Sequence, residues 1–145
     1  MRVLVSRVKS ANVAVEGQIT GKCDTGILIL SCFQEGDSIK EIEYLAKKCA
    51  NLRIFDDENG IMNKSVIDAK GTILSVSQFT LYADASKGNR PSYIKALGGE
   101  AAKILYERFN EELSKYVHTE TGVFGADMQI TAQHDGPINI IIDSK

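Results

Sequence analysis

The sequence predicts an α+β fold, in which one mixed or antiparallel β-sheet curls into a barrel-like layer against two main helices. Strand-like segments occur in groups separated by two helical segments, rather than alternating with helices one by one. An early hairpin and two closely spaced C-terminal strands favour antiparallel or mixed pairing over a doubly wound parallel sheet. The 145 residues show no internal repeat, and this length suits a single domain covering residues 1–145.

The first part of the chain has the pattern of strands. Residues 1–8 alternate loosely between apolar and polar side chains, which predicts a first strand. Residues 13–15 and 18–20 flank Glu16-Gly17, and this pattern predicts a hairpin whose turn uses the positive φ that glycine allows. Residues 27–33 are apolar almost throughout, as in a strand buried on both faces.

The first helix is expected from about residue 38 to residue 50. The segment Ser38-Ile39-Lys40-Glu41 matches a capping box, and apolar residues then recur at helical spacing. A short strand is expected at residues 52–55, followed by an acidic turn at residues 56–60. This turn resembles a calcium loop only superficially, because Val66 stands where the bidentate glutamate would be needed.

The second half of the chain predicts one strand, one helix and two closing strands. Residues 71–79 are rich in β-forming side chains, and the polar residues 82–95 predict a long loop. A helix is expected at residues 99–117. The closing strands are expected at residues 127–133 and 138–142. The apolar face expected for the second helix consists of Ala101, Leu105, Phe109, Leu113 and Tyr116.

The composition is that of an ordinary globular protein, with 43% hydrophobic and 25% charged residues. The longest apolar stretch, residues 26–30, is far shorter than the ~20 residues that a membrane helix needs. The N-terminal apolar segment is too short for a signal peptide, so we expect a cytoplasmic protein. A net charge of −2 gives no global signal for nucleic-acid binding. RNA binding would depend on a local patch, and residues 87–95, with three cations and no acid, are the best candidate; the alternative is a solvated loop.

Catalysis, if present, must use few side chains. The sequence has no nucleophile elbow, no phosphate-binding glycine loop and no zinc-protease motif. Cys23, Cys32 and Cys49 are too widely spaced for a disulfide framework or a zinc site. Cys32 and Cys49 lie in apolar patterns, so buried reduced thiols are expected at these two positions. His118 and His134 are the only histidines, and no local motif pairs either of them with a cysteine.

Three segments are candidates for a binding or catalytic site. Ser77-Gln78-Phe79-Thr80 closes a buried strand, where its amide and hydroxyl groups could face a carbonyl or an oxyanion; the alternative is that they satisfy backbone groups. Gly136-Pro137 interrupts the last apolar run, where a plain turn is the alternative. Phe124, between Gly122 and Gly125, could stack on a base or pack in the core.

These segments together resemble the D-aminoacyl-tRNA deacylase family, and the resemblance runs from end to end. The matching segments, in order, are Arg7-Val8 with Ala11, Val13 and Val15, Arg53-Ile54-Phe55, Met62-Asn63, Ser77-Gln78-Phe79-Thr80-Leu81, Lys87-Gly88-Asn89-Arg90-Pro91-Ser92, Thr121-Gly122 with Phe124-Gly125-Ala126 and Met128, and Asp135-Gly136-Pro137.

The resemblance implies a homodimeric cytoplasmic hydrolase of translation quality control, with no metal or other cofactor. Its substrates would be D-aminoacyl-tRNA and glycine mischarged on the tRNA for alanine. Ser77, Gln78, Phe79 and Thr80 would be the catalytic segment, and Phe124 and Met128 would contact the substrate. A cis Gly136-Pro137 segment, held by Arg7, would reach the partner's pocket and exclude L-amino acids. Thr80 would either position the substrate or act as a nucleophile, and we favour positioning because no base is apparent beside it.

The chain departs from the family pattern beside Gly136-Pro137. His134 and Asn139 stand where the family usually has Asn and Thr, although both replacements can still donate and accept hydrogen bonds. Two rival functions remain open from the sequence. One is a relative that tolerates some L-aminoacyl-tRNA, and the other is an RNA-binding module without catalysis.

Overall fold

A computed structural model describes residues 1–144 and confirms the predicted fold class. Its six-stranded sheet has the order β2-β1-β3-β6-β7, and β8 pairs with the other side of β1. The strands are β1 (Arg2–Val15), β2 (Gln18–Cys23), β3 (Gly26–Cys32), β6 (Thr72–Ser77), β7 (Thr119–Thr121) and β8 (Gln129–Asp143). Pairing is antiparallel around β1 and parallel between β3, β6 and β7, so the sheet is mixed.

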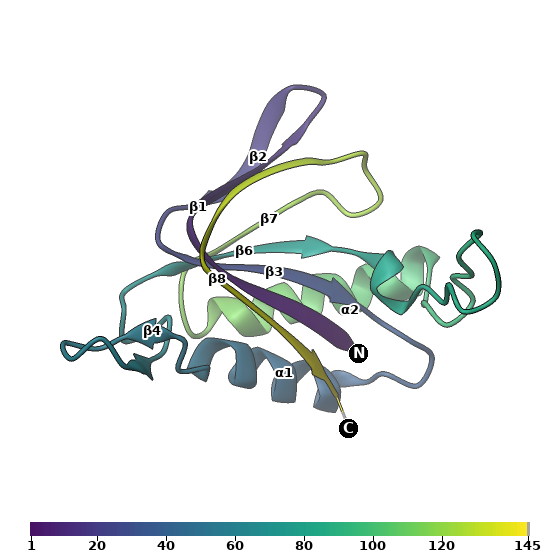
Figure 1. Ribbon diagram of the computed structural model, residues 1–145. Coiled ribbons are helices and arrows are strands. Elements are labelled where there is room, and N and C mark those ends of the chain that lie inside the picture. Colours follow the sequence, from purple (N-terminus) through teal and green to yellow (C-terminus); the bar gives the residue numbers. More distant parts are fainter. Residues whose placement is uncertain (145) are drawn as a thin grey trace.

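Both helices cover the same face of this sheet (Figure 1). They are α1 (Ile39–Asn51) and α2 (Gly99–Ser114). The main core lies between these helices and the sheet and includes Val3, Ile29, Leu45 and Phe109. A smaller cluster that includes Val13, Leu28 and Val76 lies inside the curl of the sheet. A separate small hairpin of β4 (Phe55–Asp56) and β5 (Met62–Lys64) follows α1.

The long strand β1 organises the sheet. Its first half pairs with β3 and its second half with β2 along one edge, while β8 runs along the other edge. The prediction of two separate N-terminal strands is therefore wrong, because both segments belong to one strand. The predicted hairpin is confirmed: Glu16 and Gly17 both have positive φ, as a type I′ turn requires.

The prediction for α1 is confirmed at its start. The Ser38 hydroxyl accepts a hydrogen bond from the Lys40 N–H, and the Glu41 carboxylate accepts one from the Ser38 N–H, which completes the capping box. The predicted face of α2 is partly wrong. Ala101 and Tyr116 are exposed, because the face of α2 that packs on the core includes Ala102 and Tyr106. The Tyr106 hydroxyl is satisfied in the core by donating to the Ser75 carbonyl at 2.8 Å.

Three further boundaries differ from the sequence-based predictions. The strand expected at residues 52–55 begins only at Phe55, and α2 ends at Ser114. The strand expected to reach Phe79 ends at Ser77, where the chain turns into the 3₁₀ helix η1 (Phe79–Tyr82). The two closing strands form one strand, β8, with Gly136-Pro137 inside it.

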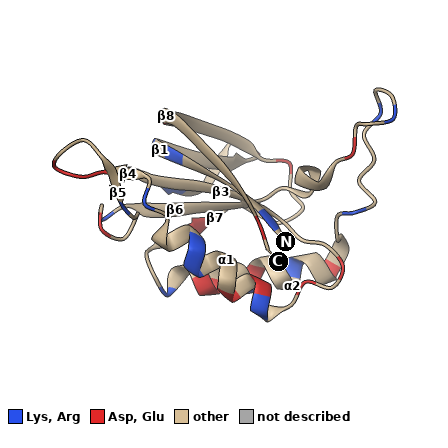
Figure 2. Cartoon of the chain, turned by 60° about the horizontal axis from the view of Figure 1, so that its bottom comes forward, with Lys and Arg blue, Asp and Glu red and all other residues tan. Residues whose placement is uncertain are grey.

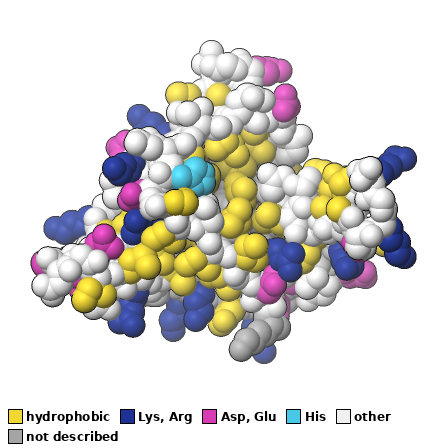
Figure 3. Space-filling view, in the orientation of Figure 1, with side chains coloured by type: hydrophobic (Ala, Val, Ile, Leu, Met, Phe, Trp, Pro, Cys, Tyr) yellow, Lys and Arg dark blue, Asp and Glu magenta, His cyan; other side chains and the backbone are white. Residues whose placement is uncertain are grey.

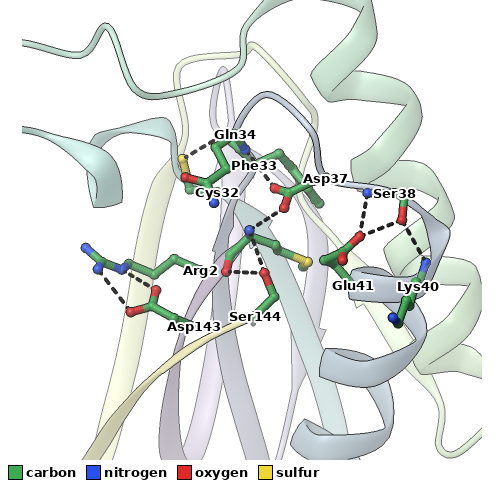
Figure 4. A network of polar contacts seen from close by, with 11 residues as sticks. Arg2, Cys32, Phe33, Gln34, Asp37, Ser38, Lys40, Glu41, Asp143 and Ser144 are labelled. Atoms are coloured by element: carbon green, nitrogen blue, oxygen red, sulfur yellow. Dashed lines mark hydrogen bonds and ion pairs between the residues drawn. The ribbon is translucent and has the colours of Figure 1, made fainter.

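The two ends of the described chain are joined by polar contacts (Figure 4). The Met1 ammonium lies 2.6 Å from an Asp37 carboxylate oxygen and donates to the Ser144 hydroxyl at 2.8 Å. Arg2 makes two hydrogen bonds with the Asp143 carboxylate, at 2.7 and 3.1 Å. These contacts hold the end of β8 against the start of β1. No helix in the part of the chain that the structure describes is long and apolar enough to cross a membrane.

Phe109→Ala tests the main core. Phe109 is fully buried between α2 and the sheet, so its truncation should lower the free energy of unfolding by about 3–5 kcal/mol. Urea denaturation followed by circular dichroism measures this change. Ile104→Ala on the outer side of the same helix is the control, because Ile104 is 57% exposed and its truncation should change stability by less than about 1 kcal/mol. Equal losses for the two variants would contradict this packing.

Candidate active site

A cavity of about 390 Å³ lies at the C-terminal ends of the parallel strands β3 and β6. Open sheets of this kind commonly bind ligands outside the carboxyl ends of their strands. The ends of β3 and β6 form one wall, and the start of α2 and the loop between β7 and β8 form the others. The cavity is lined by residues 31–33, 76–79, 97–99, 102, 124–126, 128 and 130.

Two serine hydroxyls stand side by side on the strand wall. Ser31 and Ser77 are paired in register at the ends of β3 and β6, and both line the cavity. The Ser31 hydroxyl is buried and has no hydrogen-bond partner among the described residues.

The turn η1 begins directly at the cavity. The Gln78 N–H donates to the Ser31 carbonyl at 2.7 Å, which fixes where the chain leaves the sheet. The Gln78 side-chain amide donates to the Thr80 hydroxyl. Within residues 1–144, no backbone partner is found for the N–H groups of Phe79 and Thr80, which open this turn. Two backbone donors are thus available beside Gln78.

Cys32 supports the same turn from behind. Its thiol donates to the Phe79 carbonyl at a sulfur–oxygen distance of 3.2 Å. Burial raises the pKa of the Cys32 thiol to about 11, so near neutral pH it is protonated and able to donate. Cys49 is also buried and free, as predicted, and so is Cys23, for which no burial was predicted. All three cysteines are structural thiols rather than candidate nucleophiles.

Phe124 and Met128 form the opposite wall of the cavity. The Phe124 ring packs against Tyr106, with 5.8 Å between ring centroids, so one part contacts the core and another faces the cavity. Gly122 makes room for Met128, because a Cβ at Gly122 would lie 2.6 Å from the Met128 sulfur. The two alternatives for Phe124, core packing and ligand contact, are therefore compatible.

Arg7 lies away from this cavity, in a break of the β1–β8 ladder. Ser6 pairs with Asn139 and Val8 with His134, so Arg7 alone faces residues 135–138. Its buried guanidinium donates to the Ile54 carbonyl at 2.7 Å and to the Asp135 carbonyl at 3.3 Å.

Gly136 and Pro137 occupy the bulge that Arg7 supports. Both residues are exposed, and the peptide bond between them is cis, as the resemblance implies. Gly136 has φ of 121°, and a Cβ there would lie 2.9 Å from the Ile138 side chain and 3.3 Å from an Arg7 nitrogen. Only glycine suits this position without strain.

The two residues that depart from the family pattern flank the bulge. The Ser6 hydroxyl donates to the Asn139 side-chain oxygen. His134 is exposed and lines a second cavity of about 630 Å³ together with Asn139. The rest of that cavity is apolar for the most part: Leu4, Ser6, Leu28, Leu30, Ile130 and Ala132.

The structure thus brings some predicted site residues together and leaves others apart. Ser77, Gln78, Phe79, Phe124 and Met128 share the first cavity. Thr80 adjoins this cavity through its contact with Gln78. The remaining predicted residues, Arg7, Gly136 and Pro137, lie outside the cavity of their own chain.

Several cavity residues were not predicted. Ser31, Cys32 and Phe33 end a strand that was read as core, and Ala102 lies in a helix whose buried face was misassigned. The only local signal was the pair of polar side chains, Ser31 and Cys32, at the end of an apolar run. Among the described residues, no group of three or more His, Cys, Asp or Glu side chains could hold a metal ion.

Comparison with known proteins defines the class of this protein. The family model described as D-Tyr-tRNA(Tyr) deacylase matches residues 4–143. The chain is 52% identical to a D-aminoacyl-tRNA deacylase of Dechloromonas aromatica (strain RCB) and 51% identical to one of Clostridium tetani (strain Massachusetts / E88). Each alignment covers 100% of this chain and 98% of the relative. The chain therefore belongs to the D-Tyr-tRNA(Tyr) deacylase family, as its sequence motifs predicted, and it is a hydrolase.

Two solved structures have the same fold. The structure titled "c-Myc DNA Unwinding Element Binding Protein" superposes with a TM-score of 0.94 at 40% identity, covering 100% of this chain and 99% of that one. A structure titled "Structural Analysis of a probable eukaryotic D-amino acid tRNA deacylase" has a TM-score of 0.82 at 15% identity, with 97% of each chain covered. The second likeness shows a shared fold.

Proposed function

We propose that this protein hydrolyses the ester that joins a D-amino acid to the terminal adenosine of tRNA. The products are free tRNA and the D-amino acid. The observation that carries the proposal is the cavity at the ends of β3 and β6, which gathers Ser77, Gln78 and Phe79 opposite Phe124 and Met128 in a chain of this family. The proposal includes glycine mischarged on the tRNA for alanine, and a cytoplasmic site of action.

In this proposal the ester carbonyl of the substrate lies at the start of η1. There the Phe79 and Thr80 N–H groups and the Gln78 amide supply donors where negative charge develops on the carbonyl oxygen. Water adds to the carbonyl carbon, the bond to the ribose oxygen breaks, and that oxygen takes a proton. The neighbouring ribose hydroxyl assists this proton transfer. An aminoacyl ester is already activated, so orientation and oxyanion stabilisation suffice. The adenine lies on the side of Phe124 and Met128.

Thr80 positions the substrate rather than attacking it. Its hydroxyl accepts a hydrogen bond from the Gln78 amide, which is not a base. Neither histidine is placed to activate it. His118 lies 3.0 Å from the Glu120 carboxylate, outside the cavity lining, and His134 lines the second cavity.

A second copy of the chain completes the site. Gly136 and Pro137 are exposed and do not line the cavity of their own chain, so they act in the cavity of a partner. Within the described chain β8 pairs only with β1, which leaves its outer edge open over 15 residues. Ile130 lines both cavities. Figure 3 shows hydrophobic side chains gathered in a patch on one face of the molecule, and such patches mark protein interfaces.

The Gly136-Pro137 segment then selects the hand of the amino acid. Its carbonyl groups face the α-carbon, so an L side chain collides with them and a D side chain points away. Glycine passes because it has no side chain. Rejection by collision discriminates more steeply than attraction, which supplies only about 1–3 kcal/mol per methylene. Arg7 supports the segment through its bond to the Asp135 carbonyl.

Hydrolysis of D-tyrosyl-tRNA compared with L-tyrosyl-tRNA tests the proposed function. We expect D-tyrosine, and glycine attached to the tRNA for alanine, to be released at least ~100-fold faster than L-tyrosine, because the L side chain is excluded sterically. Labelled amino acid released from purified substrates is the measurement. Similar D and L rates would favour the tolerant relative, and no release from any substrate would favour a binding module without catalysis.

Thr80→Val tests the role of the hydroxyl. We expect kcat to fall less than about tenfold, because Val keeps the shape and removes one hydrogen bond, whereas loss of a catalytic nucleophile costs about 10⁴–10⁶-fold. Steady-state hydrolysis of D-tyrosyl-tRNA measures this. Thr119→Val is the matched control, since its hydroxyl donates to the Val117 carbonyl away from the cavity. Loss of turnover in Thr80→Val with unchanged substrate binding would show a nucleophile instead.

A further inference from the structure

The loop between η1 and α2 forms an arm that stands away from the body of the protein (Figure 1). Its base is closed by two backbone hydrogen bonds between Asp84 and Ser92, of 2.8 and 2.9 Å. The Asp84 carboxylate accepts a further bond from the Ser86 N–H at 3.0 Å. The arm is therefore an ordered projection, and it begins where the active-site turn ends.

The arm concentrates positive charge in an acidic protein. The arm, residues 83–98, contains Lys87, Arg90 and Lys95 and one acid, Asp84 at its base, so it carries +2, while the whole chain has a net charge of −2 and the remainder carries −4. All three cations are exposed, and none forms an ion pair with a described residue. In Figure 2 the outer part of the arm is marked by basic positions, with one acidic position near its base, whereas acidic and basic positions are mixed along both helices.

Exposed aromatic rings connect the arm to the cavity. Phe79 lines the cavity and is 55% exposed, and its ring packs edge-on against Tyr93 of the arm with 5.1 Å between centroids. Tyr93 is 40% exposed, and its neighbour Ile94 is 90% exposed. A path of aromatic and apolar side chains thus leads from the cavity to Lys87, Arg90 and Lys95.

We propose that this arm binds the single-stranded nucleotides that precede the terminal adenosine of tRNA. The inference rests on the proposed function, which places that adenosine in the cavity. Single-stranded nucleic acid is held by exposed aromatic rings that contact bases and by cations that track phosphates, and the arm offers both in sequence from the cavity outward. Lys87, Arg90 and Lys95 contact the phosphates, and Phe79 and Tyr93 contact a base. The arm gives an acidic protein local affinity for RNA beside the cavity.

The test compares two triple variants. Lys87→Ala/Arg90→Ala/Lys95→Ala removes the cations of the arm, and Lys47→Ala/Lys48→Ala/Arg53→Ala removes three exposed cations on and after α1, which do not line the cavity. Each variant is assayed with D-tyrosyl-tRNA and with the D-tyrosyl ester of adenosine, which has no phosphate.

The salt dependence identifies phosphate contacts. When the logarithm of affinity is plotted against the logarithm of salt concentration, three phosphate contacts to single-stranded RNA contribute about 2 to the slope. Raising the salt from ~50 to ~200 mM should therefore raise KM for the tRNA about 15-fold more in the native protein than in the arm variant. The control variant should keep the native slope. Hydrolysis of the adenosine ester should be the same in all three proteins.

Two outcomes would overturn the inference and leave the proposed function intact. One is an unchanged salt slope in the arm variant with native activity on both substrates. The other is that duplex DNA inhibits hydrolysis of D-tyrosyl-tRNA more strongly than tRNA without an amino acid does, and that this inhibition by DNA is lost in the arm variant. That result would assign the arm to duplex binding. Failure of the native protein to hydrolyse either ester would instead contradict the proposed function itself.

Discussion

The break in the β1–β8 ladder at Arg7 is the constraint on which the rest of the site depends. A continuous ladder would bury or pair the backbone of β8, but here one residue of β1 faces four residues of β8. Such a bulge leaves carbonyl groups that need donors. The Arg7 guanidinium donates to the Asp135 carbonyl in the bulge and to the Ile54 carbonyl in the segment after α1, and so supports Gly136 and Pro137 at the surface. A planar, permanently charged fork suits this task better than a lysine.

This arrangement separates the two functional parts of one chain. The cavity at the ends of β3 and β6 is lined by Gln78 and Phe79, which the proposed function assigns to the ester, while the exposed bulge lies outside its lining. The open edge of β8 and the hydrophobic patch in Figure 3 supply a way to bring a second copy against the first. In the proposed function, association is therefore part of the site itself.

Local signals in the sequence predicted local structure well. The capping box at Ser38 and the Glu16-Gly17 turn depend on neighbouring residues and were correct. The face of α2 was misassigned because the side that packs on the core, which includes Tyr106, depends on contacts with distant residues such as Ser75, 31 residues away. The contribution of Cys32 was missed for the same reason, since its partner Phe79 is 47 residues away. The family motifs predicted site residues at Ser77, Gln78 and Phe124, and these three line one cavity. The register between β3 and β6 brings Ser31 to the same cavity, which the sequence did not indicate.

The most direct test of a site completed by a second copy is selectivity in mixed dimers. Gly136→Ala displaces the bulge, because its Cβ would meet Ile138 and Arg7, so this variant should hydrolyse both D- and L-tyrosyl-tRNA. Gln78→Ala keeps the bulge but lacks the amide beside the ester. When Gln78→Ala chains are mixed in tenfold excess, most Gly136→Ala chains pair with a Gln78→Ala chain. The intact cavity of the Gly136→Ala chain then faces the intact bulge of its partner. L-tyrosine release should fall about tenfold, and D-tyrosine release should be preserved. Unchanged L-tyrosine release would show that the bulge acts within its own chain and contradict the account.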